Sequence, residues 1–293
     1  MEKLAIVGLG LMGGSLGLAV RSRRPAAIVT GFARRPVTRR QALRRQAVTQ
    51  AVGDRGDAVR EADVVVLCLP VLAIPPAVAA CRLFLKPGCI VTDVGSTKAE
   101  LVRECHALLK GSGARFVGSH PIAGSEETGM AAARQDLYEG AVVVVTPAPG
   151  RSERSPEVGA IVRFWRGIGA MPVVMSASEH DRLLARTSHL PHLTAAMLVN
   201  VLLSGSRKAD ALCGPGFRDA TRVAAGSEEM WHDILKSNRQ AIAKELGAFE
   251  RVARRVRVMV ERGDFVGLRR FLAESRRMRH ELNGGLAARR TRR

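Results

Sequence analysis

A short apolar run leads directly into three closely spaced glycines near the start of the chain, where residues 3–13 read KLAIVGLGLMG. The run Leu4–Val7 has the aliphatic and β-branched composition of a buried strand. A G-x-G-x-x-G motif is informative only when a strand precedes it and a helix follows it, and residues 12–20 supply the helix. This stretch therefore predicts the first β-turn-α unit of a dinucleotide-binding sheet.

Each glycine of the motif has a separate physical role. Gly8 permits the tight turn, Gly10 lets a pyrophosphate approach the backbone, and Gly13 allows the helix to pack closely on the strand. The N-terminal end of the following helix carries a partial positive charge that favours phosphate. The predicted cofactor-binding residues of this turn are Gly8, Gly10, Leu11, Met12 and Gly13.

The residues after the second expected strand bear on the choice of nicotinamide cofactor. Enzymes that use NAD carry an acidic residue about 20 positions past the motif, where it binds the ribose 2′-hydroxyl. Here that position is Ala33, followed by Arg34 and Arg35. Guanidinium groups match the geometry of a phosphate. We therefore predict NADP over NAD, with Ala33, Arg34 and Arg35 at the 2′-phosphate.

The first half of the chain alternates apolar β-branched runs with helical segments, which indicates a doubly wound, mostly parallel α/β sheet of the Rossmann type. The expected strands are Leu4–Val7, Ile28–Phe32, Val64–Leu69, Ile90–Val94, Phe116–Gly118, Val142–Thr146 and Val173–Met175. We place a dinucleotide-binding domain at residues 1–175 and an all-helical substrate and dimerisation domain at residues 176–293.

The second half shows only helical patterns. Residues 176–179 (SASE) form a capping box, and Asp264 is expected to cap a last helix. One long helix is expected from Glu228 onward, because apolar residues recur at helical spacing. They are Leu235, Ile242, Leu246, Phe249 and Val256. This apolar surface exceeds what a thin bundle buries, so a homodimer is expected.

Composition and charge exclude several other classes of protein. No apolar run is long enough for a membrane span, and the start of the chain lacks a signal-peptide pattern, so a cytoplasmic protein is expected. The net charge is +19, but 39 of the 46 basic residues are arginine and only one tyrosine is present. A diffuse arginine excess without interleaved aromatic residues argues against nucleic-acid binding. Five cysteines without a C-x-x-C pair argue against a metal site or disulfide framework.

Polar residues follow two of the later expected strands, at the sheet edge where ligands bind in open α/β folds. Residues 93–98 read DVGSTK, and residues 118–126 read GSHPIAGSE. His120 is the best candidate for a general base, because imidazole titrates near neutral pH.

Further candidates lie in the helical half. His189 and His192 are three residues apart and share a helix face near Pro191, where a kink is expected. On their own they are better explained as a packed surface pair, and they lack a third ligand nearby for a metal site. A glycine-rich turn then leads to Arg222, whose guanidinium near a nicotinamide crevice suggests a carboxylate substrate.

Taken together, five motifs in this order resemble the prephenate/arogenate (cyclohexadienyl) dehydrogenase family of tyrosine biosynthesis, over essentially the full chain. They comprise residues 8–15, 93–98, 118–129, 188–192 and 217–231. The resemblance implies oxidative decarboxylation of a cyclohexadienol, with hydride transfer to NAD(P). It also implies a helical domain that dimerises and completes each active site.

The resemblance further implies roles for individual residues. His120 would accept the proton of the ring 4-hydroxyl, and Ser96 would hydrogen-bond to His120 and to that hydroxyl. Arg222 would hold the substrate carboxylate. The other residues implied at the substrate are His192, His189, Asp219, which would orient Arg222 or a histidine, and Glu126, which would lie near the substrate side chain. No metal is needed, and prephenate and arogenate are left equally open.

Two alternatives remain open at this point. A β-hydroxyacid dehydrogenase would share the architecture, but it normally carries a catalytic lysine on the first long helix of the second domain, and residues 180–200 contain none. A non-catalytic NADP sensor or a nucleic-acid-binding module is suggested only by the net charge. Steady-state redox assays distinguish these classes.

Overall fold

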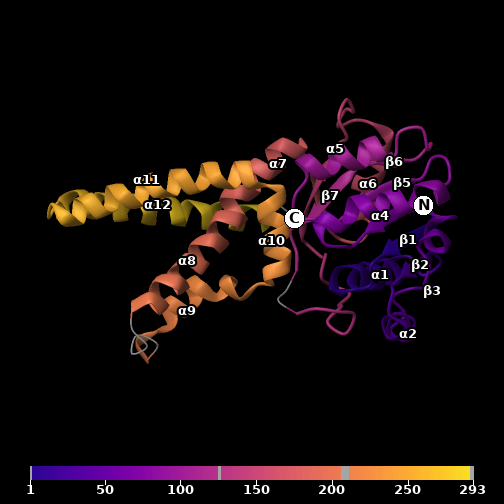
Figure 1. Ribbon diagram of the computed structural model, residues 1–293, viewed down its shortest axis with the longest axis horizontal. Coiled ribbons are helices and arrows are strands. Elements are labelled where there is room, and N and C mark those ends of the chain that lie inside the picture. Colours follow the sequence, from indigo (N-terminus) through magenta and orange to yellow (C-terminus); the bar gives the residue numbers. More distant parts are fainter. Residues whose placement is uncertain (1, 125–126, 206–210, 291–293) are drawn as a thin grey trace. The chain divides into compact units, whose positions relative to one another are not determined.

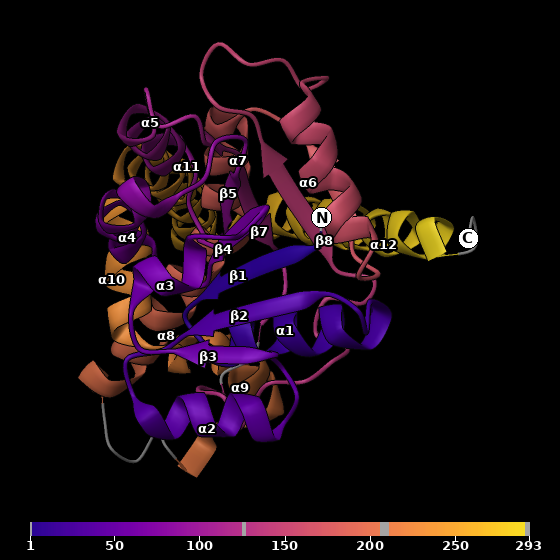
Figure 2. The same cartoon turned by 90° about the vertical axis from the view of Figure 1, so that its right-hand side faces the viewer.

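Six parallel strands form the central sheet of the computed structural model, in the order β3-β2-β1-β4-β5-β6. Figure 2 shows the first of them side by side. The structure describes residues 2–124, 127–205 and 211–290. The strands are β1 (Lys3–Val7), β2 (Ile28–Phe32), β3 (Gln50–Val52), β4 (Val64–Leu67), β5 (Ile90–Asp93) and β6 (Arg115–Phe116). The order confirms a doubly wound sheet, in which the strand order reverses beside β1.

Helices cover both faces of this sheet because alternate side chains of its strands point to opposite sides. In β1, Leu4 and Ile6 are buried in one core and Ala5 and Val7 in the other. The first core also holds α1 (Leu11–Arg23), α2 (Pro36–Arg44) and α6 (Pro156–Arg166). The second holds α3 (Arg55–Val59), α4 (Ile74–Cys81) and α5 (Ala99–Leu108). The aliphatic runs of the sequence therefore supply two separate cores.

A second, three-stranded sheet corrects one feature of the predicted strand pattern. It consists of β7 (Gly118–Pro121), β8 (Val142–Thr146) and β9 (Met171–Val174), with β7 antiparallel to β8. The single strand expected at 116–118 is thus two strands, and β3 was not expected. The hydroxyl of Ser119 connects the sheets, because it lies 2.8 Å from the hydroxyl of Thr92 in β5.

The glycine turn has the expected conformation. Gly8 has a φ of +104°, which favours glycine, and α1 begins at Leu11 directly after Gly10. A Cβ atom on Gly13 would lie 1.9 Å from the carbonyl oxygen of Gly8, whereas one on Gly10 would meet nothing within 4 Å. The packing role of Gly13 and the open space beside Gly10 both agree with the sequence prediction.

After β9, the described residues contain helices and turns but no strand, as predicted. Ser176 accepts a hydrogen bond from the backbone of Glu179, and Asp264 accepts one from Gly267, so both expected caps are present. The elements are α7 (Ala177–Leu184), a π-helical turn (Ala185–His189), α8 (Leu190–Gly205), α9 (Pro215–Thr221), a 3₁₀ turn (Arg222–Ala225), α10 (Glu228–Ser237), α11 (Arg239–Glu261) and α12 (Phe265–Arg290).

The prediction of one long helix from Glu228 is wrong in one respect. The helix is interrupted at Asn238, between α10 and α11. The Asn238 side chain is buried and donates a hydrogen bond to the carbonyl oxygen of Asp181 at 2.8 Å. A tertiary contact therefore accompanies the interruption of a pattern that reads as one helix in the sequence.

Backbone contacts divide the chain into two compact units, residues 1–242 and 243–293. The second unit contains most of α11 and the whole of α12, both labelled in Figure 1. Within it, the guanidinium of Arg255 lies 5.5 Å from the centre of the Phe271 ring. Many of its apolar side chains are exposed, namely Phe249, Val252, Val260, Phe265, Val266, Leu272, Met278 and Leu282.

None of the helices in the described parts of the chain combines the length and the apolar character that crossing a membrane requires.

The glycine geometry predicts different effects for two alanine substitutions. Gly13→Ala places a methyl group against a backbone carbonyl and should lower the free energy of unfolding by about 1–3 kcal/mol. Gly10→Ala is the matched control and should leave that free energy nearly unchanged, because its Cβ meets no protein atom. Urea denaturation of both variants measures the difference. Equal stability of Gly13→Ala and the wild type would contradict the packing role.

Candidate active site

A fully buried ion pair lies at the carboxyl end of β5. Lys98 Nζ is 2.6 Å from Asp93 Oδ2, and both side chains are fully excluded from solvent. Lys98 also donates to the carbonyl oxygens of Gly95 and Thr97, at 2.7 and 2.9 Å. The other carboxylate oxygen of Asp93 accepts the backbone N–H of Ser119 at 2.9 Å. The pair therefore links β5 of the first sheet to β7 of the second.

His120 follows Ser119 on β7 and is buried, with 9% of its surface exposed. Its Nδ1 lies 2.8 Å from Nε2 of His180, a residue of α7. Burial lowers the pKa of His120 well below its usual range, and the nearby His180 and Lys98 lower it further. The ring is therefore neutral at neutral pH, which is the state that a general base requires.

His180 is held in turn by Asp181. Nδ1 of His180 lies 2.8 Å from Asp181 Oδ1, and burial lowers the pKa of His180. Backbone N–H groups of Lys98 and Ala99 donate to the two carboxylate oxygens of Asp181, at 2.7 and 2.8 Å. Residues of β7, α5 and α7 thus form one continuous buried polar cluster.

The two histidines predicted in the helical half are both buried and lie beside Trp231 of α10. The rings of His192 and Trp231 stack with centroids 3.5 Å apart, and His189 meets Trp231 edge-on at 6.0 Å. Burial lowers the pKa of His189 to about 4. His189 Nδ1 lies 3.3 Å from Nδ2 of Asn238, which also contacts Asp181. They are therefore not a surface pair.

His192 has an unusual polar environment. Burial lowers its pKa, and a hydrogen bond with the backbone of Val223 opposes that shift. Its Nδ1 is buried and has no hydrogen-bond partner in the described parts of the chain. Since Val223 directly follows Arg222, this contact places the ring next to the turn that carries the predicted carboxylate-binding arginine.

The glycine turn and the residues after β2 fit a dinucleotide. The open space beside Gly10 at the start of α1 can admit a pyrophosphate, and no acidic residue follows β2. Ala33 is buried, whereas the side chains of Arg34 and Arg35 are exposed. The guanidinium of Arg39 donates to the carbonyl oxygens of Ala33 and Arg34, at 2.8 and 2.9 Å, and so holds this segment in place.

The remaining predicted residues are not joined to the buried cluster. Ser96 is half-buried, and Asp219 and Arg222 are exposed. In residues 2–124, 127–205 and 211–290, no hydrogen bond connects Ser96 to His120, and no ion pair joins Asp219 to Arg222. The predicted Glu126 lies outside the described residues. The roles of these four residues stay predictions.

Sequence reasoning did not assign a role to five buried polar residues that contact His120, its chain neighbour Ser119, or one another: Asp93, Lys98, His180, Asp181 and Asn238. Asp93 and Lys98 belong to the motif DVGSTK at residues 93–98, and the position of this motif at a strand end could have indicated a role. His180 and Asp181 follow the capping box of α7, where a histidine and an aspartate are as easily surface residues. Only the tertiary structure shows that both are buried.

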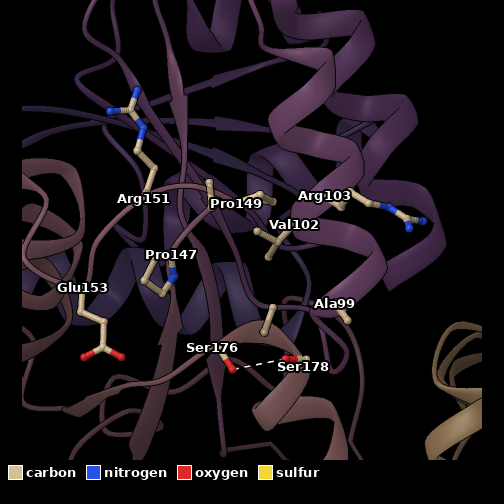
Figure 3. Close-up of a pocket in the computed structure, with 11 residues that line it drawn as sticks. Ala99, Val102, Arg103, Pro147, Pro149, Arg151, Glu153, Ser176 and Ser178 are labelled. Atoms are coloured by element: carbon tan, nitrogen blue, oxygen red, sulfur yellow. Dashed lines mark hydrogen bonds between the residues drawn. The ribbon is translucent and has the colours of Figure 1, made fainter.

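A pocket of about 420 Å³ lies between α5, the segment 147–149 and the start of α7 (Figure 3). Apolar side chains and Arg103, Arg151 and Glu153 line it. It contains none of the residues predicted for cofactor or substrate. Among the described residues, no group of three or more histidine, cysteine or acidic side chains could hold a metal ion.

Comparison with known proteins identifies the family. Residues 16–174 match the family model "Prephenate dehydrogenase, nucleotide-binding domain", and residues 176–274 match "Prephenate dehydrogenase, dimerization domain". The cyclohexadienyl dehydrogenase of Zymomonas mobilis is 33% identical over 95% of both chains.

Two solved structures are also similar over nearly the whole chain. The prephenate dehydrogenase of Aquifex aeolicus, in complex with hydroxyphenyl propionate and NAD+, is 30% identical with a TM-score of 0.88, covering 96% of this chain and 98% of that one. The arogenate dehydrogenase of Synechocystis is 29% identical with a TM-score of 0.82, covering 95% and 99%.

The fold and the matches define a nicotinamide-dependent oxidoreductase with a Rossmann domain and a helical domain. The chain belongs to the prephenate dehydrogenase family. The family resemblance inferred from the five motifs is confirmed. The chain carries both the nucleotide-binding and the dimerization domain of that family, and the enzyme class expected from the sequence is confirmed as well.

The buried ion pair predicts a large loss of stability when its cation is removed. Lys98→Met leaves the Asp93 carboxylate buried without a counter-charge and should lower the free energy of unfolding by about 3–5 kcal/mol. Lys86→Met is the matched control, because Lys86 pairs with Asp63 at a partly exposed site, and it should cost less than about 1 kcal/mol. Chemical denaturation measures both, and a similar small loss in the two variants would contradict this assignment.

Proposed function

We propose that the chain catalyses the oxidative decarboxylation of prephenate, of arogenate, or of both, with NAD(P) as hydride acceptor. The observation that carries the proposal is the buried, neutral His120 at the end of a hydrogen-bonded polar cluster, in a chain of this family. The relatives support the choice of substrates, since they are named prephenate, cyclohexadienyl and arogenate dehydrogenases.

The reaction requires from the protein mainly a base and the correct positioning of the substrate and the nicotinamide. His120 would accept the proton of the ring 4-hydroxyl as the carbon–oxygen double bond forms. The bound nicotinamide supplies the acceptor for the hydride that leaves the same carbon. The bond between the ring and its carboxylate then breaks and CO₂ leaves. The electron pair of that bond moves through the ring to the former carbonyl oxygen, which takes back the proton held by His120 to give an aromatic phenol. No metal is required for this balance.

Substrate binding is assigned to the helical half. Arg222 would hold the substrate carboxylate through a two-point contact, and its exposed position leaves the guanidinium accessible. His192 supports this placement through its contact with the backbone of Val223 and its unpaired, buried Nδ1. Ser96, His189, Asp219 and Glu126 complete the proposed set, and Ser96 would contact the substrate hydroxyl.

We also propose a preference for NADP. The absence of an acidic residue after β2 and the two exposed guanidiniums of Arg34 and Arg35 support it, since an anionic side chain there would repel a 2′-phosphate. The Arg39 contacts support it further because they hold the backbone that carries both arginines.

We also propose how the chain assembles and where its domains meet. The chain forms a homodimer through its helical part, which the dimerization-domain match and the exposed apolar side chains of residues 243–282 support. We place the domain boundary at residues 175 and 176, which the limits of the two family matches support. A cytoplasmic location remains the expectation from the sequence.

Loss of the proposed base should abolish most of the activity. His120→Asn should lower kcat with prephenate or arogenate by about a hundredfold or more, because a general base contributes about 10²–10⁴-fold. Cofactor binding, measured by fluorescence titration, should stay near the wild-type value. His106→Asn, a histidine of α5 outside the cluster, is the matched control and should retain full activity. Near-normal turnover of His120→Asn would exclude the base assignment.

Removing the two exposed guanidiniums should weaken NADP binding selectively. The double variant Arg34→Gln/Arg35→Gln should raise the Kd of NADP by roughly tenfold or more, since a hydrogen bond to a charged group contributes about 1.5–3 kcal/mol. The Kd of NAD should change little, and Arg40→Gln in α2, the helix that follows these two residues, is the control. Isothermal titration with both dinucleotides measures this. An equal change for NAD and NADP would contradict a 2′-phosphate site.

A further inference from the structure

A chain of two hydrogen bonds leads inward from His120 to a buried carboxylate. His120 Nδ1 lies 2.8 Å from His180 Nε2, and His180 Nδ1 lies 2.8 Å from Asp181 Oδ1. His180 is fully buried, and only 4% of Asp181 is exposed. The two imidazole rings meet edge-on, with centroids 5.0 Å apart. One proton therefore lies between the two rings and another between His180 and Asp181, so neither ring has much freedom to reorient.

Burial lowers the pKa of both histidines, so both rings are neutral at neutral pH. The position of these protons then depends on the charge of Asp181, since two arrangements satisfy the hydrogen bonds between neutral rings. If Asp181 is ionised, His180 donates to it from Nδ1 and accepts from His120 at Nε2. If Asp181 carries a proton, both bonds reverse, and Nε2 of His120 must hold a proton when the ring is neutral. In the second arrangement, His120 cannot act as a base through that nitrogen.

The backbone decides between the two arrangements. The N–H groups of Lys98 and Ala99 donate to Oδ1 and Oδ2 of Asp181, at 2.7 and 2.8 Å. Backbone N–H groups can only donate, and such donors favour the ionised form of a carboxylate. His180 is then neutral with its proton on Nδ1, and its unprotonated Nε2 accepts the Nδ1–H of His120. Nε2 of His120 is left without a proton.

We propose that His180 and Asp181 are positioning residues that hold the proton of neutral His120 on Nδ1, so that Nε2 is the nitrogen that accepts the substrate proton. The inference rests on the proposed function for its catalytic consequence. It needs no further reactant, because the substrate O–H bond breaks, the N–H bond forms at Nε2, and the electron pair stays on oxygen. The positive charge that His120 gains is stabilised by the negative charge of Asp181, to which His120 is connected through His180.

The hydrogen bonds that other residues make to Asp181 explain why this arrangement is rigid. The N–H groups that bind its carboxylate belong to Lys98 and Ala99, next to the buried Lys98–Asp93 ion pair. Its own backbone carbonyl oxygen accepts the side-chain amide of Asn238 at 2.8 Å. Residues from three regions of the chain, 93–99, 180–181 and Asn238, therefore fix the orientation of one imidazole, as a carboxylate does for the histidine of a hydrolase triad.

The tautomer of His120 can be measured directly, without substrate, by ¹H–¹⁵N correlation NMR of the full chain with ¹⁵N-labelled histidine. His120→Asn identifies the His120 signals in such spectra. The inference predicts that at neutral pH the Nδ1 of His120 is protonated and its Nε2 is not. Protonation of Nε2 instead of Nδ1 in the wild-type protein would overturn the inference.

Two substitutions at His180 provide the matched test. In His180→Gln, the amide oxygen can still accept from Nδ1 of His120, so the tautomer should be retained and activity partly kept. His180→Leu has no acceptor, so the two tautomers should mix and kcat should fall on the order of 10²- to 10⁴-fold with a smaller change in KM. An unchanged tautomer and kcat in His180→Leu would exclude a positioning role.

The outcomes separate the inference from the proposed function. Circular dichroism checks that each variant folds, and if His180→Leu does not, the wild-type and His180→Gln tautomers decide. If Nδ1 carries the proton as predicted but neither prephenate nor arogenate is turned over, the proposed function fails while the tautomer assignment holds. If either substrate is turned over but His120 is protonated on Nε2, only the inference fails.

Discussion

At the end of β5, the side chains of Lys98 and Asp93 meet at 2.6 Å without any exposure to solvent. Removing two charges from water carries a cost of several kcal/mol for each, which is offset only when every remaining donor and acceptor is satisfied. Here Lys98 has two backbone carbonyl partners, and Asp93 accepts the N–H of Ser119 on β7. The residue that follows Ser119 is His120, so the ion pair helps to hold the strand that carries the proposed base.

The same region also holds the residues behind His120. The backbone N–H of Lys98 donates to Asp181, and Asp181 contacts His180, which contacts His120. Residues 93–99 thus support the proposed base from two directions: through the second sheet, where Asp93 binds Ser119, and through α7, where the N–H groups of Lys98 and Ala99 bind Asp181. Because the chain belongs to the prephenate dehydrogenase family, this arrangement is part of a nicotinamide-dependent enzyme.

The sequence predicted those features that depend on local pattern. The glycine turn, the parallel sheet, the helical second half and the caps at Ser176 and Asp264 all follow from residue type and spacing. The interruption at Asn238 and the separate sheet of β7–β9 did not, because both depend on contacts between distant segments. The burial of His180 and Asp181 is of the same kind, since nothing in residues 179–181 distinguishes an interior pair from a surface one.

The central claim is that His120 receives the substrate proton while the buried cluster holds its other nitrogen. A crystal structure of the chain with a nicotinamide dinucleotide and a phenolic product analogue tests it most directly. The account predicts that the phenol oxygen lies about 2.6–3.2 Å from Nε2 of His120, with Nδ1 still bonded to His180. A phenol oxygen that contacts another side chain, or a His120 ring turned away from His180, would contradict it.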